Sequence, residues 1–91
     1  NMRELQSLSS ALVGQCGDEA LKPMLQKLAD EFRYSDPVSS EKTLEIEEDM
    51  KVQLGDIQQA LVEDDSNGAK KLCGKLMGSL AERNRICSVS K

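Results

Sequence analysis

The sequence predicts an all-α fold, a small antiparallel helical bundle built around a long helical hairpin at about residues 40–87. Apolar residues recur at intervals of three and four along most of the chain, which is the spacing of amphipathic helices. A run of turn-forming residues at 64–68 separates two long periodic segments, and so short a connection makes two helices antiparallel neighbours. Strict alternation of apolar and polar residues never persists for five positions outside the helical segments, so no strand is expected.

The first half of the hairpin is acidic and follows Ser39 and Ser40, either of which can cap a helix. Residues 41–65 carry nine acidic residues against two lysines, a net charge of −7. Apolar residues begin at Leu44 and Ile46, and the spacing then predicts a packed seam on one side of this helix. The expected seam positions are Met50, Leu54, Ile57 and Leu61.

The second half of the hairpin is basic. Residues 66–91 carry six basic residues against Glu82, a net charge of +5, and the expected seam positions are Leu72, Leu76 and Leu80. We expect the acidic helix to neutralise the basic one. An exposed ion pair contributes only about 0–1 kcal/mol, so these charges should set the orientation of the two helices more than the stability of the fold. Arg83 and Arg85 also fall near the end of the basic helix, where cations complement the helix dipole.

The region before the hairpin contains one helical element with a break near Gly17. Helical spacing runs from Met2 to Cys16, and Gly17 is a stop signal after which Asp18 can cap a second helix. Pro23 lies late for the favoured proline position, so the regular part of that helix begins either at Asp18 or near residue 22. The alternative is one helix kinked at Pro23. The chain thus forms three long helical elements, and we favour a first element that is split in two.

Residues 33–39 are predicted to form the loop before the hairpin, because the residue before Pro37 disfavours helical geometry. Tyr34 is the only tyrosine, and we expect it to anchor this loop against the hairpin.

Length and composition favour one small helical domain over residues 1–91. The 91 residues are 38% hydrophobic but include one Phe and one Tyr, so the core is expected to be aliphatic. Asn1 is not an initiator residue, and we therefore expect a fragment of a longer protein. A membrane anchor in another part of that protein is compatible with this expectation. The fragment has no long apolar run that would predict a transmembrane helix. The net charge of −4 disfavours binding to nucleic acid or to anionic membranes.

Three cysteines, Cys16, Cys73 and Cys87, are present without a CxxC motif and without any histidine. An odd number of cysteines favours free thiols in a reducing compartment, and the chain is expected to be cytoplasmic. The bundle could instead bring Cys16 opposite Cys73 or Cys87, which would make a redox-responsive domain.

Two acidic segments have weak resemblances to metal sites. Glu63, Asp65, Asn67 and Gly68 fit four positions of a calcium loop, but Gly74 replaces the bidentate Glu that the twelfth position requires. We therefore expect a helix–helix turn that is reversed by the glycine. The cluster at Glu45, Glu48 and Asp49 resembles a carboxylate metal bundle without its histidines, so a solvated face is expected and no cofactor is predicted.

Gly74 and Gly78 are spaced by four residues in the middle of the basic helix, next to Met77. Each glycine costs roughly 1 kcal/mol relative to alanine inside a helix. We therefore expect another backbone to pass close to them, from this chain or, as the second choice, from a second copy.

These patterns predict a non-catalytic helical interaction or oligomerisation module of a larger protein. No histidine is available as a general base or as the partner of a nucleophilic thiol, so no enzyme activity is expected. The expected partner is a protein, either a second copy or an unknown one, and a homodimer is one possible form. The redox-responsive domain and the carboxylate metal-binding bundle are the alternatives.

Overall fold

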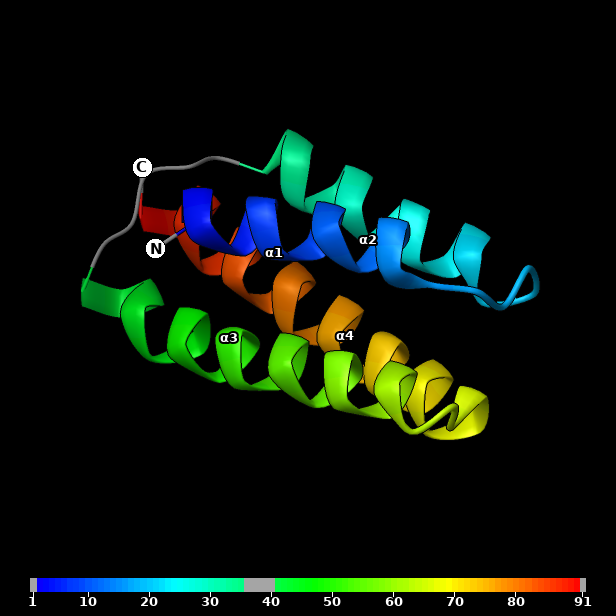
Figure 1. Ribbon diagram of the computed structural model, residues 1–91. Coiled ribbons are helices and arrows are strands. Elements are labelled where there is room, and N and C mark those ends of the chain that lie inside the picture. Colours follow the sequence, from blue (N-terminus) through cyan, green and yellow to red (C-terminus); the bar gives the residue numbers. More distant parts are fainter. Residues whose placement is uncertain (1, 36–40, 91) are drawn as a thin grey trace.

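The computed structural model describes residues 2–35 and 41–90, with side chains through Cys87, and within these ranges it is all-helical. Four helices follow one another along the chain: α1 (Met2–Gln15), α2 (Lys22–Tyr34), α3 (Glu41–Val62) and α4 (Ser66–Ser90) (Figure 1). The expectation of three long elements is therefore replaced by four helices, because the break near Gly17 separates α1 from α2. The predicted caps at Ser39 and Ser40 lie outside the described residues, as does the part of the predicted 33–39 loop around Pro37. The predicted start of this loop is too early, because Arg33 and Tyr34 belong to α2.

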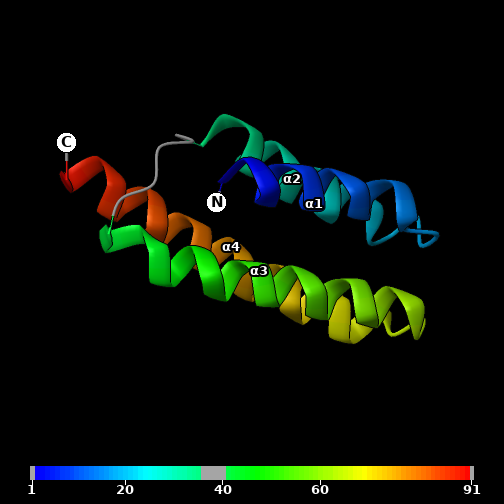
Figure 2. The same cartoon turned by 60° about the vertical axis from the view of Figure 1, so that its left-hand side comes forward.

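The four helices form two antiparallel hairpins that pack on each other. Helices α1 and α2 form the shorter hairpin, and α3 and α4 form the longer one (Figure 1). Helix α1 packs on α3, and α2 packs on α4, in a body of about 40 × 19 × 18 Å. The α1–α2 loop and the α3–α4 turn lie at the same end of the molecule, which Figure 2 also shows. One end of the bundle is thus built from two turns.

The break between α1 and α2 is organised by Asp18 rather than by Gly17 alone. The Asp18 carboxylate accepts a hydrogen bond from the Ala20 amide at 2.9 Å, and its carbonyl accepts one from the Lys22 amide at 2.9 Å. These bonds form one turn of chain before the regular helix begins at Lys22. Pro23 then occupies the second helical position, where a backbone N–H has no partner to lose.

The core is aliphatic, as the composition predicts. Phe32 is the one aromatic side chain in it, and it is completely buried. The other members come from all four helices and from the loop after α1, and they are Met2, Leu5, Leu12, Cys16, Leu21, Leu25, Leu28, Met50, Leu54, Ile57, Ala60, Ala69, Cys73, Leu76 and Leu80.

The expected seam between α3 and α4 lies in this core. Met50, Leu54, Ile57, Leu76 and Leu80 are buried, whereas Leu61 and Leu72 are partly buried at its edge. Ala69 and Cys73, which belong to the periodic apolar run of the basic helix, lie between the larger residues together with Ala60, which the sequence analysis did not assign. They let the two helices approach each other near the turn. Leu44 is half exposed at 50%, so the apolar face of α3 that contacts the core begins at Ile46 and not at Leu44.

Two charged residues lie inside the hairpin. Arg83 is completely buried and Glu47 is 3% exposed, and the Arg83 Nε donates to the Glu47 Oε2 at 3.1 Å. The interpretation of Arg83 as a cation for the end of the helix is therefore wrong. Arg85, in contrast, is exposed and pairs with Glu82 on its own helix. Among the described residues, the ion pair between Glu47 and Arg83 is the one that joins the acidic helix to the basic helix, because helix geometry turns most other charges outward.

The neighbours of this ion pair extend it toward α2. The Arg83 Nη1 donates to the Asn84 side-chain oxygen at 3.3 Å, and the Asn84 amide donates to the Ser35 hydroxyl at 3.1 Å. The Ser35 hydroxyl in turn donates to the carbonyl of Glu31 at 2.6 Å. This network ties the end of α2 to the second half of α4.

The turn after α3 differs from the expected one. It is a Schellman motif, in which the Asp65 amide donates to the Ala60 carbonyl at 2.8 Å and the Asp64 amide to the Leu61 carbonyl at 3.2 Å. Asp64, with φ 58°, adopts the left-handed conformation that the motif requires. Gly68, predicted to reverse the chain, lies instead in the first turn of α4. Its amide donates to the Asp65 carboxylate at 3.0 Å, so that Asp65 caps the helix.

Replacing Asp64 with glycine should raise the free energy of unfolding by about 0.5–1 kcal/mol. The left-handed conformation of Asp64 is unfavourable for an L-residue, and glycine removes this strain from the folded state. The strain removed exceeds the stability lost through the extra conformational freedom of glycine in the unfolded chain. Urea unfolding followed by circular dichroism measures the change. Asp65→Ala is the matched comparison with the opposite sign, since it should cost about 1 kcal/mol by removing the cap. A loss of stability in Asp64→Gly would contradict this account of the turn.

Tyr34 does not anchor its loop. The side chain is 81% exposed and lies beside the guanidinium of Arg33, whose carbon is 5.9 Å from the ring centroid. The expectation that Tyr34 packs on the hairpin is wrong. Phe32, one half-turn earlier on α2, occupies the buried position instead.

Candidate interaction surface

The exposed side of α4 carries the two interior glycines. Gly74 and Gly78 are exposed, and apart from the adjoining residues and the nearby backbone of α4 itself, no atom of the described residues lies within 4 Å of a Cβ built on either one. The expectation that a backbone of the same chain passes close to them is therefore wrong for the described part of the molecule. The space over both glycines is open.

Three lysines surround Gly74 on this side of the helix. Lys70 and Lys71 precede it by one turn, and Lys75 follows it directly, so they share its face or flank it. All three are exposed, and within residues 2–35 and 41–90 none of them forms an ion pair. We call Lys70, Lys71, Gly74, Lys75 and Gly78 the lysine–glycine patch. The sequence analysis counted these lysines among the charges to be neutralised by the acidic helix, although the four-residue spacing of Lys70, Gly74 and Gly78 could have placed Lys70 beside the glycines.

Met77 lies at the edge of this patch and faces a groove. It is partly buried against the core, and with Leu80 and Ala81 it lines a hollow of about 250 Å³ between α4 and α2. Lys27 and Glu31 of α2 form the opposite wall. The three residues singled out from the sequence thus lie together on α4, with the glycines on open surface and Met77 turned toward α2.

The exposed side of α3 has the opposite charge. Glu45, Glu48 and Asp49 are all exposed, and Leu44 and Val52 lie among them with 50% and 63% of their surface exposed. We call these five residues the acidic patch. Lys51 borders it but points to α1, where its Nζ lies 2.9 Å from the Glu4 Oε1. Helix α3 therefore presents carboxylates and aliphatic side chains together on one face.

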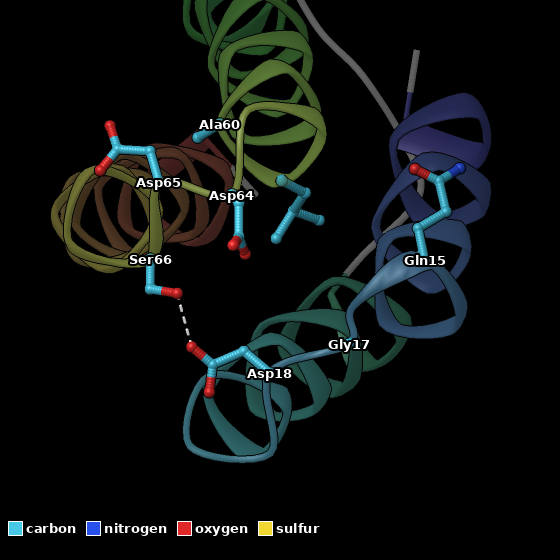
Figure 3. Close-up of a pocket in the computed structure, with 8 residues that line it drawn as sticks. Gln15, Gly17, Asp18, Ala60, Asp64, Asp65 and Ser66 are labelled. Atoms are coloured by element: carbon cyan, nitrogen blue, oxygen red, sulfur yellow. Dashed lines mark hydrogen bonds between the residues drawn. The ribbon is translucent and has the colours of Figure 1, made fainter.

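A small pocket lies where the two turns meet (Figure 3). Its volume is about 270 Å³, and Asp18, Asp64 and Gln15 contribute polar side chains to it. The Ser66 hydroxyl donates to the Asp18 Oδ2 at 2.5 Å, which joins the first loop to the start of α4. This bond, followed by the one from the Ala20 amide, lowers the pKa of the Asp18 carboxyl below its ordinary value.

The pocket does not assemble a metal site from the residues that resemble a calcium loop. Figure 3 shows the Asp65 carboxylate directed away from Asp18, on the far side of the turn. Asn67 and Gly68, two further residues of that resemblance, lie within α4. In the described part of the chain, no three Cys, Asp or Glu side chains are placed to hold one metal ion. The same holds for the exposed cluster at Glu45, Glu48 and Asp49.

The structure brings two of the three cysteines into one core. Cys16 and Cys73 are both buried in it, and the Cys16 thiol donates to the Asp18 carbonyl at 3.4 Å. Burial, and secondarily the nearby Cys16, raises the pKa of the Cys73 thiol from 9.0 to about 11. Cys87 lies partly exposed near the end of α4. The two thiols of the redox hypothesis thus lie in the same core, and Cys73 is held in its unreactive protonated form.

The raised pKa of Cys73 should make the protein less stable above pH 9. Between about pH 9 and 11 the unfolded chain has lost the thiol proton while the folded chain retains it. The unfolded state therefore binds fewer protons, and the free energy of unfolding falls by at most about 1.4 kcal/mol per pH unit. Urea unfolding at several pH values measures this slope, and Cys73→Ala should have a flatter profile than the unchanged chain. Equal slopes in both proteins would contradict the assignment.

No helix in the described ranges is both long enough and apolar enough to cross a membrane. In comparisons with known proteins, no family model matches the chain, and neither a curated protein nor a solved structure matches it.

Proposed function

We propose that this chain is a non-catalytic helical interaction module, and that the lysine–glycine patch of α4 packs against a helix of another molecule. The observation that carries the proposal is the open space over Gly74 and Gly78. Both glycines are interior to a 25-residue helix, where each costs roughly 1 kcal/mol relative to alanine. No neighbour in the described chain makes use of them. A second helix backbone that approaches closely is the physical use to which such a pair is suited.

The surroundings of the glycines are consistent with this role. Exposed lysines can steer and orient a partner that carries carboxylates, and they contribute specificity more than affinity. Met77 at the border of the patch offers a flexible apolar side chain that adapts to a partner surface. We further propose a cytoplasmic location, because Cys16, Cys73 and Cys87 are free thiols and free thiols persist in a reducing compartment.

Substituting glutamine for both glycines tests this function, because stability and association should change in opposite directions. Glutamine is a good helix former and meets no obstacle at either site, so Gly74→Gln/Gly78→Gln should raise the free energy of unfolding by about 0.5–1 kcal/mol per site. The longer side chains should keep a partner helix away from the patch. Association should therefore weaken although the fold becomes more stable.

Light scattering after size exclusion, over a hundredfold range of concentration, measures self-association in both proteins. A photo-crosslinking residue at position 78 detects a different partner in cell extract. The control site is position 14, another open glycine, which lies on α1. The proposal requires an adduct from position 78 that Gly74→Gln removes, or a self-association that the double substitution removes. Identical behaviour at positions 78 and 14, with no self-association, would overturn it.

A redox-responsive role is the second candidate, and the burial of Cys16 and Cys73 in the same core favours it. It requires both buried thiols to react with an oxidant in the native state. Titration of the thiols at neutral pH distinguishes the two functions, since the interaction module requires no reaction at Cys16 or Cys73.

A further inference from the structure

We propose that the partner of the lysine–glycine patch is the acidic patch of a second copy of this chain, so that α4 of one molecule packs on α3 of another. The inference rests on the proposed function and names the occupant of the surface. It concerns two outward faces of the longer hairpin, neither of which is covered by α1 or α2.

Charge complementarity is the first argument. The lysine–glycine patch carries three exposed lysines, and the acidic patch carries three exposed carboxylates. In the part of the chain that the structure describes, none of these six residues forms an ion pair. Lys70 and Glu48 have weaker electrostatic interactions with Asp18 and Lys51, but no charge of either patch has an oppositely charged partner within ion-pair distance in the described residues. A second copy offers the complementary set of charges to each face.

Shape is the second argument. Each patch covers eight residue steps of helix, from 44 to 52 and from 70 to 78, which correspond to about 12 Å along the axis. The acidic patch projects two aliphatic side chains, Leu44 and Val52, from among its carboxylates. The lysine–glycine patch lacks side chains at Gly74, between its lysines, and at Gly78, one turn further along α4. The two glycines are about 6 Å apart along the axis, so one aliphatic side chain of the other face has room over them while charged groups pair beside it.

The two patches differ from each other, so the contact joins unlike surfaces of the two copies. Such a contact either is made twice in a closed dimer or repeats from copy to copy. In both cases a molecule that lacks one patch still possesses the other. Two molecules with different defects should therefore restore one intact contact when they are mixed.

The experiment uses two variants of the whole chain in light scattering and sedimentation. One variant, Gly74→Gln/Gly78→Gln, blocks the lysine–glycine patch, and the other, Glu45→Lys/Glu48→Lys, reverses the charge of the acidic patch. Glu19→Lys/Glu63→Lys is the control with the same change of net charge, at exposed sites outside both patches and outside the groove beside Met77. Circular dichroism establishes that every variant is folded.

We expect the unchanged chain to self-associate, and more weakly in 0.5 M than in 0.05 M salt because the paired charges are screened. Each patch variant alone should associate at least about tenfold more weakly, as the loss of a close charge pair or of close packing implies. An equimolar mixture of the two should form a 1:1 complex, and the control should behave as the unchanged chain.

The outcomes separate this inference from the proposed function. If the acidic-patch variant self-associates as the unchanged chain does while the glycine variant does not, the partner is another surface; the inference is overturned and the interaction module stands. A chain that remains monomeric at every concentration also overturns the inference, and an adduct from position 78 with a different protein then supports the module alone. If both variants self-associate normally and position 78 gives no specific adduct, both proposals fail.

Discussion

Replacing Glu47 with alanine should lower the free energy of unfolding by about 3–5 kcal/mol, because Arg83 would be left as a buried charge without its carboxylate. Arg83 is completely buried and Glu47 is 3% exposed, so neither water nor salt can compensate the loss. The effect is a large part of the stability of a domain of this size. Urea unfolding followed by circular dichroism measures it.

Glu48→Ala is the matched control for this prediction. Glu48 is the next residue of α3 and is exposed, so its removal should change the free energy of unfolding by at most about 0.5 kcal/mol. Replacing both members of the pair, as Glu47→Leu/Arg83→Met, should restore most of the stability, because apolar residues of similar size need no charged partner. Similar losses in Glu47→Ala and Glu48→Ala would show that the buried pair does not exist in solution.

Replacing Phe32 with alanine should cost about 3–5 kcal/mol, the usual result of removing a fully buried aromatic side chain. Phe32 fills the core from α2, and its carbonyl also accepts a hydrogen bond from the Gln6 side chain of α1 at 2.9 Å. The cavity would lie between the shorter hairpin and the longer one. Phe32→Leu retains most of the volume and should cost less than about 1.5 kcal/mol.

Tyr34→Ala is the control, since it removes the other aromatic ring from the same helix. The Tyr34 side chain is 81% exposed, and its loss should change the free energy of unfolding by at most about 0.5 kcal/mol. Thermal and urea unfolding of the three variants gives the comparison. A larger loss for Tyr34→Ala than for Phe32→Ala would contradict the packing of α2.

Several features of this protein followed from the order of its residues alone. Helical spacing predicted the all-helical fold, the short connection at 64–68 predicted the antiparallel pairing of the two longest helices, and the composition predicted an aliphatic core. Gly17, Asp18 and Pro23 indicated the break after α1 because their backbone preferences are local. The seam of α3 and α4 could be listed from its spacing because a helix repeats every 3.6 residues.

Other features depend on contacts between residues distant in the chain, and the sequence did not determine them. Net charge does not reveal which single glutamate and which single arginine meet inside the hairpin, and Glu47 lies 36 residues from Arg83. Local propensity favoured Gly68 as the reversing residue, but the Schellman motif places the left-handed conformation at Asp64.

The surfaces were decided by the tertiary structure as well. The pattern at Gly74 and Gly78 was recognised in the sequence, but whether they face the bundle or open space depends on the rotation of α4 against its neighbours. Tyr34 and Phe32 are two residues apart on one helix, and only the docking of α2 on the core decides that Phe32 is buried and Tyr34 exposed. Periodicity in a sequence defines which residues share a face, whereas packing between helices selects the faces that remain available to a partner.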